Sequence, residues 1–308
     1  MTMAAWLVFA LLTPILWAVG NIIEKFQIDK VFKHWLSYFT TAYVLWSSLV
    51  FSILLFDFNS IVSSFDPSYA ALAFASGLVG TVGVVFYLKA VSKEDASRVV
   101  PLSYTSVVFA AVFAFLFLQE TFSFPKYAGM ALLVAGAVVV SYKKIGGCRF
   151  TFTRVAPLVL FSAFMEAISD LLDKFFLLRF DFWSLIFWAY FGGLVVIAAI
   201  FAKKSNHVHL PKISELVGNG KKGMWALLLA TMVIYFAADV TWLVALSQAP
   251  LSLVVMLNTT SPMFVLVFAL ILTVFTPKIL KEEVNKSIVS LKLAAVVLIM
   301  LGAYLIVV

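Results

Sequence analysis

Charged residues are scarce in this chain. Only 12% of its 308 residues are Asp, Glu, Lys or Arg, whereas 64% are hydrophobic. A water-soluble domain has about 25% charged and about 45–50% apolar residues, which lets polar groups cover its surface. This chain cannot cover its surface in that way, so lipid must be its solvent. The scarcity of charge excludes a soluble domain and predicts an integral membrane protein.

Cysteine and catalytic motifs are scarce as well. Cys148 is the single cysteine, which excludes an intramolecular disulfide and a metal site built from several cysteines. The chain also lacks the nucleophile-elbow, phosphate-loop and zinc-binding helix patterns that would indicate catalysis. We therefore expect no enzyme activity, no catalytic residues, no cofactor and no metal.

The first apolar run, residues 1–23, lacks two features of a signal peptide. No basic segment precedes it, and no convincing small-residue cleavage site follows it. We interpret this run as a retained helix.

Basic residues outnumber acidic ones and give a net charge of +7. They lie in the short segments between apolar runs, which is typical of membrane topology rather than of a nucleic-acid partner. Of the 22 Lys and Arg, 19 lie in or beside the five links that join odd-numbered runs to the next run. The positive-inside rule places these links in the cytoplasm and both termini outside.

Long apolar runs dominate what is present. A helix that crosses a bilayer needs about 20 apolar residues. We expect ten transmembrane helices, near residues 4–24, 35–56, 68–89, 97–118, 126–142, 156–178, 183–202, 223–247, 250–275 and 287–307.

An internal repeat relates the two halves of the chain. Residues 21–26 and 170–175 share the pattern polar-x-x-acid-Lys-Phe at an offset of 149, and residues 87–92 match 242–247 at an offset of 155. Because each half has an odd number of helices, the halves enter the membrane from opposite sides, as in transporters that alternate access around a midplane site. The sequence predicts an all-α integral membrane fold with ten transmembrane helices as two inverted five-helix repeats, 1–143 and 155–308, joined by a basic linker at 144–154.

Two sets of motifs resemble the EamA-type repeat of the drug/metabolite transporter superfamily. In the first half, residues 100–103 read Val-Pro-Leu-Ser, residues 119–121 read Gln-Glu-Thr, and Gly136 follows. In the second half, residues 257–264 contain Ser261-Pro262, and Gly302 follows. The chain departs from the family at Gln119, where the family usually has Gly, and at the turn 275–277, which has no adjacent Glu.

The resemblance implies a secondary transporter of small organic solutes, often an exporter of amino acids, amines or related metabolites. It implies a multi-pass protein of the plasma (cell) membrane, a monomer or a homodimer, with the lipid bilayer and a small-molecule substrate as partners and no nucleic acid. It also implies cytoplasmic termini, which conflicts with the distribution of basic residues. A sugar-phosphate or nucleotide-sugar carrier and a facilitative channel stay open as alternatives.

Acidic residues within the apolar runs are the strongest functional candidates, because a charge at the bilayer centre costs about 2.5–3.5 kcal/mol on insertion scales. Glu166, Asp170 and Asp173 have the spacing i, i+4, i+7, which places them on one helix face. The pattern indicates a site for protons or a cation. The alternative is a structural ion pair with a Lys of a neighbouring helix.

Other polar residues repeat this spacing. Asp239 shares a face with Tyr235 and Trp242, which suits a pocket that holds a solute by stacking or cation–π contact. Since acids outnumber bases at the deeper positions, we expect a cationic or zwitterionic solute, or protons that compete with it. The candidate substrate or coupling residues are Glu166, Asp170, Asp239, Asn21, Tyr87, Trp242, Tyr235 and Asn258, and the candidate gate or interface residues are Glu24, Lys25, Asp173 and Lys174.

Overall fold

The structure, a computed structural model, describes residues 5–63, 66–94, 96–121, 123–145, 149–152, 154–203, 222–261, 263–265, 267–268, 271 and 286–307. Most of the link at 203–222, Pro262 and the turn at 275–277 lie outside the described residues.

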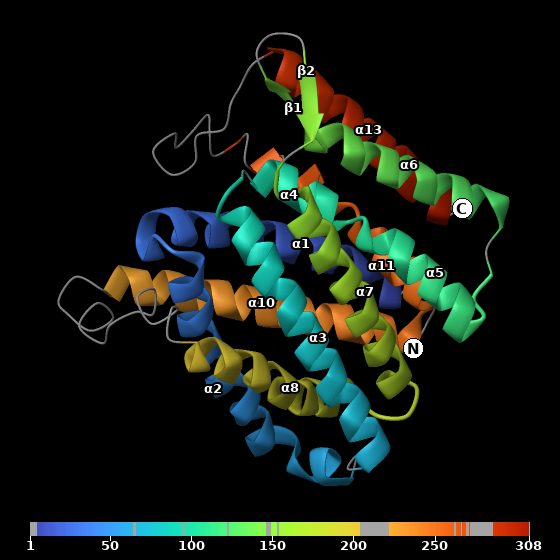
Figure 1. Cartoon of the computed structure of the whole chain (residues 1–308). Coiled ribbons are helices and arrows are strands. Elements are labelled where there is room, and N and C mark those ends of the chain that lie inside the picture. The colour runs from blue at the N-terminus through green and yellow to red at the C-terminus, as the bar shows by residue number, and fades with distance from the viewer. Residues whose placement is uncertain are drawn as a thin grey trace.

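Helices make up most of the part of the chain that the structure describes (Figure 1). The first half contains α1 (Ala5–Phe26), a short π-helical turn η1 (Gln27–Phe32), α2 (Trp35–Ser63), α3 (Pro67–Val91), α4 (Ala96–Ser103), α5 (Ser106–Leu118) and α6 (Phe124–Ser141). The second half contains α7 (Ala156–Leu177), α8 (Phe182–Ala202), α10 (Lys222–Gln248), α11 (Leu251–Asn258) and α13 (Lys286–Val307).

Several of these helices are long and apolar enough to cross a bilayer. Among the described residues, four segments meet this criterion: Trp6–Phe32, Pro67–Val91, Phe182–Ala202 and Lys222–Gln248. The chain is therefore an all-α integral membrane protein in its main architecture.

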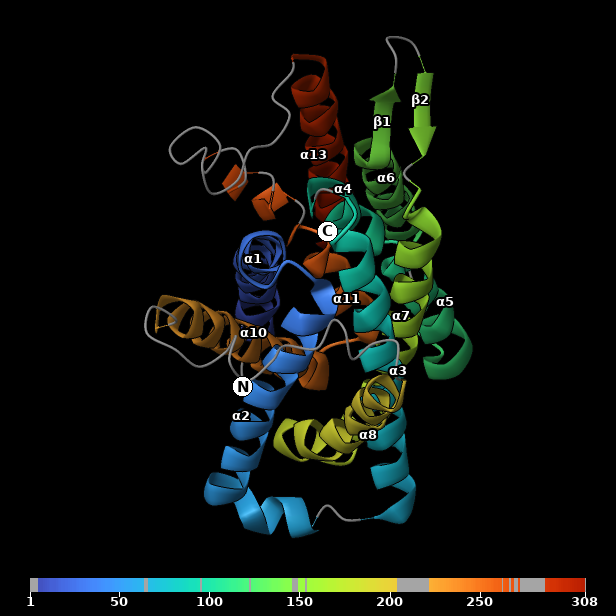
Figure 2. The ribbon, with the colours of Figure 1, turned by 60° about the vertical axis from the view of Figure 1, so that its left-hand side comes forward.

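A short hairpin occupies part of the linker expected at 144–154. Its strands β1 (Tyr142–Ile145) and β2 (Arg149–Phe152) pair antiparallel, with Tyr142 opposite Phe152. The hairpin extends beyond the end of α6 (Figure 2).

Acidic residues begin two of the long helices. Asp66 caps α3 by accepting a hydrogen bond from the Ser68 amide at 3.0 Å, and Asp181 caps α8 by accepting one from the Ser184 amide at 3.0 Å. Each carboxylate satisfies an amide that has no partner within its helix. Arg179 joins these two helix starts through an ion pair with Asp66 at 3.4 Å.

The helix expected at 97–118 is not continuous, so the expectation of a single unbroken helix was wrong. α4 ends at Ser103 and α5 begins at Ser106. The Thr105 hydroxyl donates to the Leu102 carbonyl at 2.9 Å, which offers the backbone an alternative to a regular helix. The same turn recurs 155 residues later, where the Thr260 hydroxyl donates to the Leu257 carbonyl at 2.9 Å after α11.

The helices pack in pairs that combine both halves of the chain. α3 packs against α7 and α8, α1 packs against α10, and α6 packs against α13 (Figures 1 and 2). α3 and α8 touch at backbone distance, because a Cβ added to Gly77 would lie 1.8 Å from the Ala189 carbonyl oxygen.

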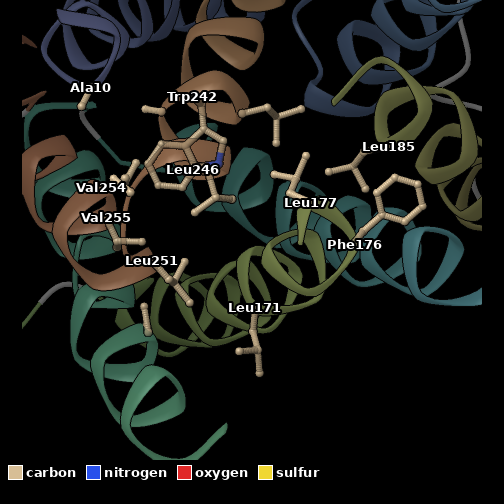
Figure 3. Close-up of a cluster of buried hydrophobic side chains, with 14 of the residues drawn as sticks. Ala10, Leu171, Phe176, Leu177, Leu185, Trp242, Leu246, Leu251, Val254 and Val255 are labelled. Atoms are coloured by element: carbon tan, nitrogen blue, oxygen red, sulfur yellow. The ribbon is translucent and has the colours of Figure 1, made fainter. Parts of the chain in front are cut away.

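An apolar cluster beside these pairs combines residues of both halves, most of them from the second half. Leu171, Phe176 and Leu177 of α7 lie near Trp242 and Leu246 of α10 and near Leu251, Val254 and Val255 of α11 (Figure 3). The polar residues of α7 are not part of this cluster.

Candidate functional site

Both halves of the chain line a cavity of about 480 Å³. Its wall comes from α1, α2, α3 and α4 of the first half and from α7, α8 and α10 of the second half. Among the described residues that line it, none is Lys, Arg or His, and the acids are Glu24, Glu166, Asp170, Asp173 and Asp239.

The polar residues of the cavity wall can be ordered by the level along α3 at which each of them lies. At one end, Ser76 of α3 donates a hydrogen bond to Asp173, and its hydroxyl lies 3.0 Å from that of Ser169. Two turns further along α3, the Ser162 hydroxyl donates to the Gly83 carbonyl at 2.8 Å. α7 therefore runs antiparallel to α3, and its acids follow the cavity wall from the level of Ser76 to the level of Gly83.

The acid of α10 lies at the Asp173 end of this wall. The Trp17 indole donates to the Asp239 carboxylate at 3.3 Å, and the rings of Trp17 and Trp242 are 5.4 Å apart at 41°. Asp239 lies within electrostatic range of Asp173. This end of the cavity combines two carboxyl groups with two indole rings.

The opposite end is formed by Glu24 and several phenol groups. Glu24 is 6% exposed, and its Oε1 atom has no hydrogen-bond partner among the described residues. Tyr38 and Tyr235 lie beside its carboxyl group. The Asn21 side-chain oxygen accepts from the hydroxyls of Tyr87 at 3.3 Å and Tyr235 at 3.2 Å, which fixes the phenols around this end.

Carboxyl groups of like charge are neighbours along α7. The charge of Asp170 interacts with those of Glu166 and Asp173. Among the described residues, no ion pair involves any of these three acids, so the alternative of a structural ion pair with a Lys has no support there. Like charges repel strongly in a low dielectric, so this wall can neutralise its charge by taking up protons or a cationic solute.

Repeat-equivalent positions of the two halves line the same cavity. At the offset of 149, Trp17 corresponds to Glu166, Asn21 to Asp170, and Glu24 to Asp173, and all six residues line the cavity. Tyr87 and Trp242, which correspond at the offset of 155, also line it. The two halves thus use the same positions but fill them differently, and most of the acids lie in the second half.

Lys25 and Lys174 are not part of the cavity wall. The Lys25 ammonium group donates to the carbonyls of Val91 at 2.6 Å and Glu94 at 3.2 Å, at the end of α3. The Lys174 ammonium group donates to the carbonyls of Leu246 and Ala249, both at 2.7 Å, at the end of α10. The acceptors correspond at an offset of 155, so each lysine satisfies the last carbonyls of a repeat-equivalent helix.

The structure brings most of the sequence-predicted residues together. Seven of the eight candidate substrate or coupling residues line the cavity, and so do Glu24 and Asp173, which we had grouped with the gate. Asn258 is not among the lining residues; it is 5% exposed at the end of α11. The lysines Lys25 and Lys174 bind helix ends instead.

Sequence reasoning missed some residues that shape the site. Ser76 and Tyr38 line the cavity, but single Ser and Tyr residues inside apolar runs carry no distinctive signal. Glu120 was noted only as part of a turn. Its carboxylate accepts from the Leu251 amide at 3.0 Å and from the Ser252 amide at 3.3 Å, so it caps α11 from the other half. The presence of a Glu in that turn was the only feature of the sequence that pointed to this capping role.

Comparison with known proteins identifies the kind of fold. Residues 4–142 match the EamA-like transporter family. An uncharacterized transporter of Bacillus subtilis, YdfC, is 29% identical over 58% of this chain and 58% of its own length. An uncharacterized transporter of a Sinorhizobium species is 36% identical over 21% of this chain and 47% of its own length. The chain thus spans less than two thirds of either of these relatives.

Two further matches extend the comparison. An uncharacterized protein of Methanocaldococcus jannaschii, MJ1333.1, is 27% identical over 44% of this chain and 95% of its own length. A solved crystal structure superposes on 99% of this chain and 96% of its own with a TM-score of 0.68 and 15% identity, which shows a shared fold alone. The matched family is one of transporters rather than of enzymes.

Proposed function

We propose that the protein is a secondary active transporter that exports a small organic solute. The proposal proceeds from the match of residues 4–142 to the EamA-like transporter family. The solute would be an amino acid, an amine or a related metabolite, carried across the cell membrane by alternating access. The observation that carries this proposal is the cavity of about 480 Å³, which both halves line at repeat-equivalent positions. Alternating access requires such a site between two elements that can move against each other.

Reciprocal packing supports ten spans arranged as two inverted repeats. By sequence offset, α1 corresponds to α7, α3 to α10, and α4 to α11. The α1–α10 contact is then the counterpart of the α7–α3 contact, and α11–α1 is the counterpart of α4–α7. α6 and α13 correspond to each other and pack together. This reciprocity is what a two-fold relation between inverted halves would produce.

The charge of the cavity wall favours the proposed solutes over the anionic solutes of the alternative carriers. A sugar-phosphate or nucleotide-sugar carrier must hold a polyanion, for which Lys and Arg are the suitable residues. The described wall offers five carboxyl groups and no basic side chain. This composition favours an amine or a zwitterion over an anionic solute.

Proton coupling would involve the acids of α7. Glu166 and Asp170 are neighbours on one helix face. Asp170 also lies near the carboxyl group of Asp173. Glu166 also lies near the hydroxyls of Tyr87 and Tyr104. Two adjacent carboxyl groups in a poorly solvated site share protons more readily than they carry two charges. Binding of a cationic solute would then compete with binding of protons.

Reconstitution of the purified chain in liposomes tests the proposal. A thermal-shift screen of amino acids, amines, sugars and nucleotides would select the solute, and counterflow of that solute would then be measured with its radiolabelled form. We expect saturable uptake that is accelerated by unlabelled solute inside the liposomes. A conductance that does not saturate, without counterflow, would instead identify a channel.

A further inference from the structure

We propose that the cavity binds an elongated organic dication, an α,ω-diamine with one ammonium group held at each end of the polar wall. This inference rests on the proposed transport function and names the class of solute that the same cavity would carry.

The charge of the described wall calls for more than one positive charge. Five carboxyl groups line the cavity without a basic side chain. Lys25 and Lys174, the lysines nearest to them in sequence on α1 and α7, use their ammonium groups on helix-end carbonyls. Since repulsion among the carboxylates is strong in a low dielectric, a cargo with two charges compensates the wall better than a cargo with one.

The carboxyl groups are spread along the cavity rather than gathered at a point. Asp173 is bound at the level of Ser76 on α3, whereas Glu24 lies near Tyr87, eleven residues further along the same helix. A rise of 1.5 Å per residue separates these levels by about 16 Å. The described residues contain no group of three or more acids, His or Cys arranged to hold one metal ion. This spacing suits a long cation rather than a compact one.

A buried acceptor at the Glu24 end is directed into the cavity. Glu24 is only 6% exposed, and its Oε1 atom lacks a hydrogen-bond partner among the described residues. A buried acceptor without a partner costs about 1–3 kcal/mol, so a further N–H donor at this atom, beside the phenols of Tyr38 and Tyr235, would stabilise the site. An ammonium group supplies three N–H donors.

Small and apolar residues line part of the stretch between the two ends. Gly77, Gly80 and Val84 of α3 belong to the cavity wall there, and methylene groups can pack against this surface. The indole rings of Trp17 and Trp242 lie 5.4 Å apart at the Asp239 end, where ring faces attract an ammonium group. The cavity therefore matches a cation whose two charged ends are joined by an apolar chain.

Calorimetric titration of the full chain in lipid nanodiscs tests the proposal with two matched probes. 1,8-Diaminooctane and octylamine share an eight-carbon chain that is long enough for the separation of the two ends, but the diamine has two amino groups and octylamine has one. We expect 1,8-diaminooctane to bind at least about tenfold more tightly, which is what one additional charge-assisted contact provides. Equal binding of the two amines, or saturable binding of neither, overturns the proposal.

Variants of the two ends add a second measurement. Glu24→Gln alone, and Asp173→Asn combined with Asp239→Asn, should each weaken 1,8-diaminooctane binding about tenfold and change octylamine binding less than about threefold. Asp66→Asn, at a helix start outside the cavity, keeps a side chain that can cap α3 and should change neither. An equal loss for both amines would refute recognition at two ends.

The transport and binding proposals fail in distinguishable ways. If 1,8-diaminooctane binds as expected but no solute shows counterflow in liposomes, the diamine site stands and the transport function is wrong. If another solute shows counterflow and neither amine binds, the transport function stands and the diamine proposal is wrong.

Discussion

Glu166 illustrates how single positions set the chemistry of the cavity. Its repeat equivalent is Trp17, and both side chains line the same space. The sequence predicted the acidic face of α7 because an acid in a lipid-facing run requires a polar environment. The partners Ser76 and Tyr38 could not be predicted, since their roles depend on the crossing of α3 and α2 with helices far away in sequence.

At the residue scale, we predict that Glu166→Gln lowers transport of the selected solute at least about tenfold and weakens its dependence on external pH. The glutamine keeps the size of the side chain but can neither carry charge nor exchange a proton. Initial rates of uptake into liposomes across a series of external pH values measure the effect. Asp66→Asn serves as the control outside the cavity. Normal rates with an unchanged pH profile would remove Glu166 from the coupling mechanism.

A second acid gives an independent prediction, because Asp239 lies on α10 and not on α7. Asp239→Asn keeps an oxygen that can accept from the Trp17 indole, so the contact at 3.3 Å can survive. We expect the variant to fold with an unchanged melting temperature but to bind the solute several-fold more weakly. A lower melting temperature together with normal binding would assign Asp239 a structural role. Thermal unfolding and calorimetry of one preparation separate the two outcomes.

The helix ends are where sequence and structure diverge at the scale of elements. The boundaries of the long helices lie near the predicted ranges, because apolar runs between polar links locate them directly. The interruption at Tyr104–Thr105 was missed, since short polar residues such as Ser103 and Ser106 also occur inside continuous membrane helices and a threonine hydroxyl accompanies the turn. Capping by Lys25 and Lys174 was missed because their carbonyl acceptors lie 66–75 residues away in sequence.

We predict that Lys25→Met and Lys174→Met each destabilise the folded protein. Each variant keeps the apolar stem and removes an ammonium group that satisfies two helix-end carbonyls; Lys25→Met also removes the half-exposed ion pair with Asp29 at 3.3 Å. Hydrogen bonds to a charged group contribute about 1.5–3 kcal/mol, so the melting temperature in detergent should fall clearly. Lys93→Met, at an exposed lysine close to the Lys25 acceptors, should leave it nearly unchanged. Equal melting temperatures for all three variants would contradict the capping role.

The crossing of α3 and α8 depends on the absence of side chains. A Cβ at Gly77 would lie 1.8 Å from the Ala189 carbonyl oxygen, and one at Gly192 would lie 1.9 Å from the Phe74 carbonyl oxygen. We expect Gly77→Ala and Gly192→Ala to separate the helices and lower stability by at least about 1–3 kcal/mol. Gly223→Ala is the matched control, because a Cβ there meets no heavy atom within 4 Å. The measurement is thermal unfolding in detergent; a drop for Gly223→Ala alone would contradict the prediction.

At the scale of the whole molecule, the composition together with the length of the apolar runs was enough to predict an all-α membrane protein. The offsets of 149 and 155 predicted which segments correspond. They could not predict how the halves meet, because the pairing of α3 with α8 and of α6 with α13 depends on close contact between small residues on both partners. Membrane orientation stays a prediction, and the distribution of basic residues opposes the family resemblance on this point.

The single cysteine offers a direct test of membrane orientation. Cys148 falls between β1 and β2 in the sequence, after five of the ten expected spans. We predict that a membrane-impermeant maleimide labels it from the cytoplasmic side, and that reporters fused to either terminus lie outside. Labelling from outside with cytoplasmic termini would reverse the orientation. Labelling from the same side as the termini would contradict five spans in each half.

Lys25 and Lys174 make the same contact at the ends of two corresponding helices, α3 and α10. The chain therefore contains two copies of the same contact. The same substitution can be made in each copy and measured under identical conditions of lipid, temperature and expression. Any difference between the two results then reports how unequal the halves are in the state that was measured. A solute that favours one state over the other should enlarge or reverse that difference, without any need for a second protein as a reference.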